Sequence, residues 1–288
     1  MEIQYSTRMK YCCSLIVCLF AIAFSCHAQD YALVPETFYP HKDSEAKVHV
    51  LDLNQMVKQY DMGFDASKTE KFVLHSGKRK TDLLGAVKDS VATVKFENDG
   101  LNTLEVDRKP VTDDIERDDF LKILDDEGLN QYSEKAKNGS KDSFRERYTW
   151  YLKSLLEVDK HNPNDFEKPL GQEYEIVLKD NPYKGNYGDD ISAVVLFKGK
   201  PLSGATVIFY IKTAGNSVFV QKLSSDKQGM IYFKLTREGL YMLRSLYMQP
   251  SKDKNADFNT WMTTFTFAFT SENDTPNTYK EFGFGNVH

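Results

Sequence analysis

Histidine is the residue of this 288-residue chain best suited to hold a transition metal, because a neutral imidazole nitrogen is a strong ligand for nickel, cobalt and zinc. His49 and His75 both stand in segments whose composition predicts strands. Converging strands would bring them together with a carboxylate such as Asp52 or Glu36. No two histidines are spaced by two or four residues, so the chain lacks a compact metal motif. His49 and His75 are therefore candidate ligands of a divalent metal, with ordinary surface or strand-edge histidines as the alternative.

Carboxylates offer a second kind of chemistry. The densest acidic region, residues 113–127, has the oxygen ligands that calcium prefers, yet it lacks the spacing of an EF-hand loop and suits a solvated helix face. Asp189 and Asp190 are adjacent, so on a strand they would point to opposite faces and could not act as a hydrolytic pair. No nucleophile elbow, phosphate-binding loop or dinucleotide fingerprint is present. These patterns predict a protein that is not an enzyme and has no resident cofactor.

Aromatic side chains are abundant in the second half of the chain. A two-sheet sandwich buries one face of every strand, so most of them belong in a core. A row left exposed on one sheet would instead suit a sugar ring or a partner protein. The residues concerned are Phe209, Tyr210, Phe219, Tyr232, Phe233, Tyr241, Tyr247 and Trp261.

The first 28 residues have the pattern of a secretory signal peptide. Arg8 and Lys10 precede an uncharged run over residues 11–29, which reaches small residues at Cys26-His27-Ala28. The apolar core of about 12 residues is shorter than the roughly 20 that a membrane-spanning helix needs. We therefore expect cleavage after Ala28, an exported mature chain, and no transmembrane span within it.

Two details of this leader stay open. Translation could begin at Met1 or at Met9. The small residue Ser25 precedes Cys26, so a lipoprotein anchored through Cys26 is the alternative to a soluble periplasmic protein. The mature chain would have no disulfide, zinc-thiolate site or cysteine nucleophile, because every cysteine lies in the leader. These are Cys12, Cys13, Cys18 and Cys26.

The charge of the mature chain excludes one class of partner. Loss of Glu2, Arg8 and Lys10 with the leader leaves 35 basic and 41 acidic residues, a net charge of −6. Nucleic acids bind basic proteins, so we expect no nucleic-acid partner. A small solute, a metal ion, or an envelope or transporter protein remain as candidate partners.

The mature chain divides near residue 165. There the polar, turn-rich segment 160–165 separates a part that mixes strands with helices from a part that consists mainly of strands. We expect a mainly β protein with two β-rich domains. Residues 29–165 would form an N-terminal domain that ends in two short helices, one over 120–127 with Gly128 at its stop and one that begins at Ser143, ends near Tyr151 and passes into a strand over 152–158. Between them, 135–141 is expected to be a loop, and Asp99-Gly100 is expected to turn a strand pair.

Residues 166–288 read as strands separated by turns. Seven short strands at this spacing favour an immunoglobulin-like β-sandwich, followed by a polar tail. The expected strands are 174–179, 191–197, 205–212, 217–223, 230–235, 239–248 and 260–269.

An ordered series of segments resembles the exported bacterial family labelled domain of unknown function 4198, over about residues 30–270. The series comprises Phe120-Leu121, Glu127-Gly128-Leu129, Arg145-Glu146-Arg147-Tyr148, Lys153-Ser154-Leu155-Leu156, Pro169-Leu170-Gly171, Tyr174-Glu175-Ile176-Val177-Leu178, Asn181-Pro182-Tyr183, Val194 to Val207, Ser225 to Gly229 and Gly239 to Arg244.

The resemblance implies an exported, β-rich envelope protein, and family members are often described as a periplasmic component of a cobalt or nickel transport system. This chain departs from the family pattern at two places. Gln29 stands where relatives have a histidine, and the strand at 246–248 has none. The resulting expectation is a non-enzymatic binding or accessory protein of the cell envelope, linked to nickel or cobalt uptake. The alternative is a surface adhesion, carbohydrate-contact or protein-contact β-sandwich module.

Overall fold

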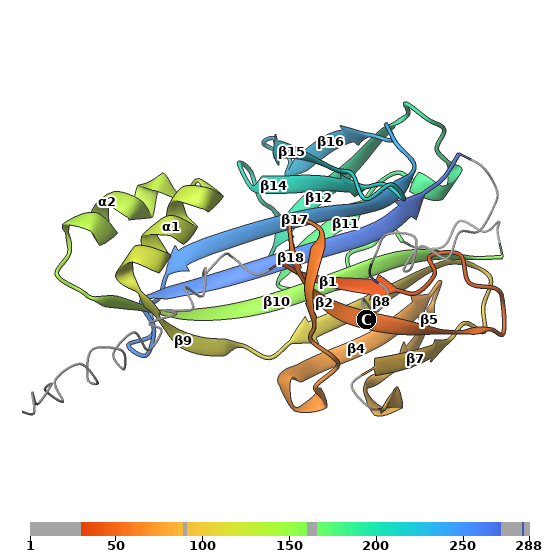
Figure 1. The fold of residues 1–288 in the computed structure, drawn as a ribbon, viewed down its shortest axis with the longest axis horizontal. Helices are drawn as coiled ribbons and strands as arrows, with labels where there is room; N and C mark the ends of the chain where they lie inside the picture. Colours follow the sequence, from red (N-terminus) through yellow and green to blue (C-terminus); the bar gives the residue numbers. More distant parts are fainter. Residues whose placement is uncertain (1–29, 89–90, 160–165, 272–283, 285–288) are drawn as a thin grey trace, which may run out of the picture.

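The computed structural model describes residues 30–88, 91–159, 166–271 and 284, and it shows a mainly β protein built from three sheets (Figure 1). The predicted leader, including Cys26, lies outside these residues. The N-terminal sheet has the order β1-β2-β7-β6, with β3 paired to β2. Its strands are β1 (Asp30–Pro35), β2 (Glu45–Asn54), β3 (Val57–Asp61), β6 (Val87–Lys88) and β7 (Val91–Lys95).

The central sheet has nine strands in the order β15-β14-β17-β18-β10-β8-β4-β5, with β9 paired to β10. Its long middle strands β10 and β18 run parallel, and its other pairs are antiparallel. The strands are β4 (Thr69–Ser76), β5 (Arg79–Asp82), β8 (Gly100–Arg108), β9 (Val111–Glu116), β10 (Ser143–Val158), β14 (Thr206–Lys212), β15 (Val218–Ser224), β17 (Gly239–Pro250) and β18 (Phe258–Phe269).

The C-terminal sheet has four strands, in which β12 pairs with β11, β13 and β16. They are β11 (Tyr174–Leu178), β12 (Asp190–Phe197), β13 (Lys200–Pro201) and β16 (Met230–Lys234). Short 3-10 helices occupy Ala66–Lys68, Leu84–Ala86 and Pro182–Lys184.

The outer sheets cover opposite faces of the central sheet. Along β10, Trp150, Leu152 and Leu156 pack in one core with the N-terminal sheet, while the alternating Tyr151 and Leu155 pack in another core with the C-terminal sheet. Side chains of a strand alternate between its faces, so β10 is buried on both. We call the face of the central sheet that carries Tyr151 and Leu155 its C face.

The seven strands expected in residues 166–288 are all present, each within two residues of its predicted ends. Four of them, β14, β15, β17 and β18, lie in the central sheet and face β11, β12 and β16 across an apolar core. This is the β-sandwich that the sequence predicted, with the strands divided four and three as in an immunoglobulin-like fold.

The central sheet also extends across residue 165, the proposed domain boundary. It combines β4, β5, β8, β9 and β10 from before that residue with four strands from after it. β10 and β18 share nine register pairs, from Glu146 with Phe258 to Ser154 with Thr266. The two-domain division stays a prediction, and the sheet is continuous through the two parts that it would separate.

Two short helices are present, α1 (Arg117–Glu127) and α2 (Asn130–Asn138), at one end of the long strands (Figure 1). The first was predicted, and Gly128 ends it in the left-handed conformation at φ 73°. Phe120 of α1 stacks on Phe144 of β10, and both contact Phe258 of β18. The helices therefore bury apolar faces against the central sheet.

The second helix was placed wrongly by the sequence. Residues 143–151 belong to β10, whose remainder 152–158 was predicted as a strand, and residues 135–138 of the predicted loop belong to α2. The spacing of Ser143 and Glu146 resembles a helix cap, but the run that follows alternates with a period of two. Because both faces of β10 are buried, few polar residues mark that alternation.

The prediction that Asp99-Gly100 forms a turn between two paired strands was also wrong. β7, before it, pairs with β2 in the N-terminal sheet, while β8, after it, pairs with β4 and β10 in the central sheet. The segment therefore carries the chain from one layer to the next.

A buried ion cluster joins three distant parts of the fold. Arg244 of β17 binds Asp30 at the start of β1 and, at 2.6 Å, Glu127 at the end of α1. All three side chains are less than a tenth exposed. Burial raises the pKa of Asp30, although the Arg244 guanidinium opposes that rise.

No helix in the described part of the chain combines the length and apolar character needed to cross a membrane.

Candidate functional site

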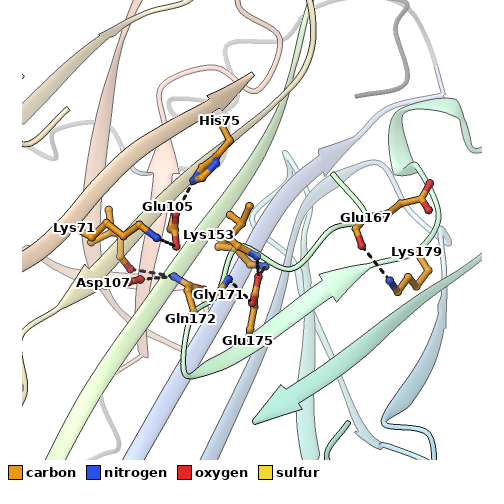
Figure 2. Close-up of polar contacts among 12 residues, drawn as sticks. Lys71, His75, Glu105, Asp107, Lys153, Glu167, Gly171, Gln172, Glu175 and Lys179 are labelled. Atoms are coloured by element: carbon orange, nitrogen blue, oxygen red, sulfur yellow. Dashed lines mark hydrogen bonds and ion pairs between the residues drawn. The ribbon is translucent and has the colours of Figure 1, made fainter. Parts of the chain in front are cut away.

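Charged side chains gather on the part of the C face formed by β4, β8 and β10 (Figure 2). Phe72, Leu74, Leu104 and Val106 on these strands pack toward the N-terminal sheet. The residues that alternate with them point to the C face. They are Lys71, His75, Glu105, Asp107 and Lys153, and we call them the charged network together with Gln172 and Glu175.

Glu105 lies at the centre of the charged network and is fully buried. One of its carboxylate oxygens accepts a hydrogen bond from His75 Nε2 at 2.6 Å, and the other accepts one from Lys71 Nζ at 2.6 Å. Burial alone would raise the pKa of Glu105, but these two donors outweigh it and hold the pKa below its usual value. Glu105 is therefore an ionised carboxylate with both oxygens engaged.

Lys153 and Glu175 form a second buried pair. Lys153 Nζ donates to Glu175 Oε1 at 2.9 Å, and the two side chains are only 2% and 1% exposed. Burial lowers the pKa of Lys153, and the Glu175 charge opposes that change. Glu175 also accepts backbone N–H groups of Leu170 at 2.7 Å and Gly171 at 3.1 Å. The pair therefore attaches the segment before β11 to the central sheet.

Gln172, in the same segment, makes a further contact with the central sheet. Its Nε2 donates to Asp107 Oδ1 at 2.7 Å. Burial, and then the nearby charge of Glu105, raise the pKa of Asp107 to about 6. Asp107 thus titrates in a range where small changes of environment alter its charge.

A cleft of about 440 Å³ opens beside the charged network. Its floor comes from β10 and β18, and one wall comes from the segment that Glu175 and Gln172 hold in place. Tyr151 spans part of it by donating its hydroxyl to Glu173 Oε2 at 3.3 Å. The lining is Glu70, Asp107, Pro110, Arg147, Thr149, Tyr151, Gly171, Glu173, Asn259, Thr260 and Trp261.

The lining combines three carboxyl groups with one guanidinium. Glu70, Asp107 and Glu173 oppose Arg147, and Lys198 pairs with Glu173 at 3.0 Å. Thr149 and Asn259 add neutral hydrogen-bonding groups, and Trp261 adds an aromatic surface. A small cleft with convergent polar groups on rigid strands is suited to binding a polar solute that carries positive charge.

The two predicted metal ligands do not share a site. His75 belongs to the charged network, on the C face of the central sheet. His49 lies on β2, on the face of the N-terminal sheet opposite to Val48 and Val50, and its side-chain partners come from that part of the chain. The two histidines therefore have different carboxylate partners.

His49 has acidic neighbours of its own. Its Nδ1 lies 2.6 Å from Asp61 Oδ2, and its Nε2 lies 3.8 Å from Glu36 Oε1. Glu36 was expected there, whereas Asp61 was not. Nowhere in residues 30–88, 91–159, 166–271 and 284 do three or more histidine, cysteine, aspartate or glutamate side chains form a group that could hold a metal ion.

Sequence reasoning missed Glu105, Lys153 and Glu175. The signal that could have found them is a charge inside an apolar strand: Glu105 stands between Leu104 and Val106, and Lys153 follows Leu152. A charged residue at such a position must find a partner when it is buried.

The model of one protein family, described as "Domain of unknown function (DUF4198)", matches residues 26–249. No curated protein matches this chain.

Three solved structures show weak similarity. The first is a tetra-tandem repeat from the extending region of a large adhesion protein (8% identity, TM-score 0.23, 85% of this chain and 50% of that chain). The second comprises three N-terminal domains of the Hoc outer capsid protein of bacteriophage RB49 (7%, 0.21, 84% and 100%). The third is the D0-D1 domain of intimin (13%, 0.20, 84% and 98%). TM-scores at this level do not establish a common fold.

Proposed function

This chain belongs to the DUF4198 family, and from that premise we propose that it is an exported, non-enzymatic binding protein of the bacterial cell envelope whose ligand occupies the cleft beside the charged network. The observation that carries the proposal is the cleft itself, since its polar lining stands on strands and on a segment fixed by buried ion pairs. A backbone framework held in this way keeps the cleft in shape, so little backbone entropy is lost when a ligand binds.

The charge of the lining indicates the ligand class. Three carboxyl groups face the Arg147 guanidinium and the Lys198 ammonium that pairs with Glu173, which leaves an excess of one carboxyl group and favours a small solute with a positive charge and several hydrogen-bonding groups. Arg147 would accommodate a carboxylate on the same solute, so a basic amino acid fits the cleft, whereas a diamine would contact the carboxyl groups alone.

The non-enzymatic part of the proposal rests on how the charged network is paired. Three groups in the cleft or beside it could transfer a proton. His75 and Lys153 are each bound to a buried carboxylate, His75 to Glu105 and Lys153 to Glu175. Asp107, with a pKa of about 6, accepts a hydrogen bond from Gln172, so all three groups are assigned to holding the site in shape.

Export and location are proposed from the leader pattern and the family resemblance. Cleavage after Ala28 would give a periplasmic protein, and modification of Cys26 would give an anchored one. Intact mass measurement of the protein purified from its own envelope distinguishes the two. A mature chain that begins at Gln29 supports the first, and a lipid-modified Cys26 supports the second.

The test of the binding proposal is isothermal titration calorimetry of the protein with L-arginine, L-lysine, putrescine, glucose, nickel, cobalt, zinc and calcium. We expect a saturable heat with at least one of the cationic organic probes, and none with glucose. Glu173→Gln should weaken that binding roughly tenfold, because it removes one charge-assisted hydrogen bond. Glu134→Gln, an exposed glutamate on α2, is the matched control and should leave it unchanged.

Other outcomes have defined meanings. Binding of nickel or cobalt alone, insensitive to Glu173→Gln, would replace the cleft proposal with the metal-uptake function implied by the family resemblance. Binding of glucose alone would favour the carbohydrate-contact alternative. No heat with any probe at millimolar concentration would overturn the binding proposal.

A further inference from the structure

Lys198 stands on a tight turn beside the cleft. It is the first residue of the two-residue turn Lys198-Gly199, which joins β12 to β13 where Phe197 pairs with Lys200. Both turn residues have left-handed backbones, at φ 52° and φ 71°. A turn of this kind favours asparagine or glycine at its first position, because most other residues are strained there. The backbone therefore disfavours a lysine at this position, and the contacts of its side chain must compensate.

The Lys198 ammonium contacts one carboxylate and two aromatic rings. Its Nζ lies 3.0 Å from Glu173 Oε1, and it lies over the rings of Phe197 and Trp261 at 5.1 Å and 5.6 Å from their centres. The face of an aromatic ring attracts a cation within about 6 Å. The backbone N–H of Lys198 also donates to the Glu173 carbonyl at 2.6 Å. The ammonium therefore occupies a place made of one negative charge and two aromatic surfaces.

Two of these three partners belong to the cleft. Glu173 and Trp261 both line it, and Tyr151, another lining residue, donates its hydroxyl to the second Glu173 oxygen. A carboxylate beside an indole ring is the part of the lining best suited to hold an ammonium or a guanidinium group. In this structure that place is taken by a lysine of the protein itself.

We propose that Glu173, Trp261 and Phe197 form the cation subsite of the cleft, and that Lys198 is a tethered competitor which the cationic group of the ligand displaces. The inference rests on the binding function proposed above, and it adds where the positive charge of the ligand lies and what limits its affinity.

Displacement of Lys198 needs no change in the backbone. Rotation of the flexible lysine stem moves the ammonium into solvent while the turn stays in place. The side chain of Lys198 is already 58% exposed, and that of Glu173 is 37% exposed. An ion pair as exposed as this one contributes little free energy. One cation can therefore readily replace another at the cation subsite.

This exchange selects ligands by their charge. A cationic group restores a positive charge to Glu173 and to the two rings as it displaces the ammonium. A neutral solute such as glucose would separate Lys198 from Glu173 without offering a counter-charge. Lys198 therefore keeps neutral ligands out of the cation subsite, and it weakens the binding of cationic ligands by competition.

Calorimetry with variants at residue 198 tests the competition. The probe is whichever of L-arginine, L-lysine and putrescine binds the wild type most tightly. Lys198→Asn removes the ammonium and provides a residue that suits the left-handed turn, so it should tighten binding roughly two- to fivefold. Lys198→Arg retains a cation and should bind no more tightly than the wild type. Lys200→Asn, which removes an equal charge at an exposed position two residues away, is the matched control and should leave the affinity unchanged.

Nuclear magnetic resonance of the protein with carbon-13-labelled lysine gives a readout that needs no ligand. Protons over the face of an aromatic ring are shifted upfield, so the end of the Lys198 side chain should give an upfield signal. Its absence from the spectrum of Lys198→Asn assigns it. Addition of the cationic probe should return the signal to the position of an exposed lysine.

The outcomes separate this inference from the binding function on which it rests. A probe that binds the wild type and Lys198→Asn equally well, or that binds without moving the Lys198 signal, overturns the cation subsite and leaves the binding function standing. Equal tightening by Lys200→Asn overturns it too, since net charge would then explain both effects. A Lys198 signal without an upfield shift overturns it whether or not a probe binds. No binding of any probe overturns both proposals.

Discussion

The C face of the central sheet has two parts with opposite chemistry. Where β14, β17 and β18 face the C-terminal sheet, it carries Phe209, Tyr241 and Phe267, all buried. Where β4 and β8 extend past that cover, it carries His75 and Glu105, and Lys153 of β10 lies at the border between the two parts, flanked by Tyr151 and Leu155 of the apolar core; all three charged side chains are also buried. Burial alone therefore does not determine which residues are apolar.

The difference lies in what covers each part. The apolar part meets another sheet, so its side chains gain free energy by leaving water together. The charged part meets a single segment, 170–175, whose backbone N–H groups and side chains provide hydrogen-bonding partners. We expect the first part to supply stability and the second to hold the cleft in shape, because a buried ion pair adds little net stability but is costly to break.

The largest effect should come from the apolar part. Phe267 is fully buried and stacks on Tyr241 with ring centres 5.0 Å apart. Phe267→Ala should lower the free energy of unfolding by about 3–5 kcal/mol, since it removes buried area and leaves a cavity. Urea denaturation measures this loss. Tyr232→Ala, at an exposed aromatic, should change it by less than about 0.5 kcal/mol, and equal losses at both would refute the contrast.

A smaller but still large effect is expected from breaking the ion pair of the charged part. Glu175→Gln should cost about 3 kcal/mol, because it leaves Lys153 buried without its counter-charge. Adding Lys153→Met should recover most of that loss. If the double variant is as unstable as the single one, the cost arises from the segment 170–175 and not from the charge.

The pH dependence of Glu175→Gln has a defined sign. The pKa of Lys153 is already lowered by burial and should fall further without Glu175. The unfolded chain then binds more protons than the folded one, so stability should rise as pH is raised toward the ordinary lysine pKa. Urea midpoints at a series of alkaline pH values test this, and a flat profile would contradict it.

Asp107 should produce a moderate effect that also depends on pH. Its pKa of about 6 in the folded protein lies above the ordinary aspartate value, so the folded state holds a proton that the unfolded state releases earlier. Stability should therefore decrease as pH rises between about 4 and 6. Asp107→Asn should remove this decrease and gain about 1–2 kcal/mol at neutral pH.

Asp52 gives the matching control, because burial and the charge of Asp30 raise its pKa to about 6 as well. Asp52 lies on β2, outside the charged part. Asp52→Asn should remove a separate portion of the same pH dependence, and the double variant should remove both. A stability difference between the wild type and the double variant that stays constant between pH 4 and 6 would show that neither carboxyl is shifted.

The smallest effect should come from His75. Glu105 keeps its contact with Lys71 when His75 is changed, and glutamine still offers a donor. His75→Gln should therefore cost about 1 kcal/mol or less. His75→Leu should cost more, since it removes the donor to a buried carboxylate. Equal stability of the two variants would show that the hydrogen bond contributes nothing.

Much of the fold could be predicted from local patterns. The seven strands after residue 166 were found because turn residues separate them and side chains alternate along them. α1 and its stop at Gly128 were found from an apolar face and a glycine at the stop position. These features depend on neighbours within a few residues, so a single sequence contains them.

The helix expected at Ser143 shows where local patterns fail. The spacing of Phe144, Tyr148, Tyr151 and Leu155 fits one face of a helix, yet the segment pairs with β18, more than 100 residues later. Partners on both sides and cores on both faces stabilise β10 as a strand. Tertiary contacts of this kind outweigh intrinsic propensity.

The candidate site shows the same contrast between local patterns, which the sequence reveals, and contacts between distant residues, which it does not. Sequence singled out histidines for their chemistry, but it could not tell that His49 would bind Asp61 and His75 would bind Glu105. It gave no reason to connect Lys153 with Glu175 or Asp107 with Gln172. Those pairs depend on a segment before β11 returning to lie on β8 and β10.

The amino-acid sequence by itself determined the mainly β class, most strand positions and the first helix, because alternation, turns and helix stops are local properties of the backbone. The tertiary structure alone decided which sheet each strand joined, which face each side chain occupied, and which buried charges found partners. The physical reason is that strand pairing and ion pairing join residues far apart in the chain, and their free energy depends on the whole arrangement.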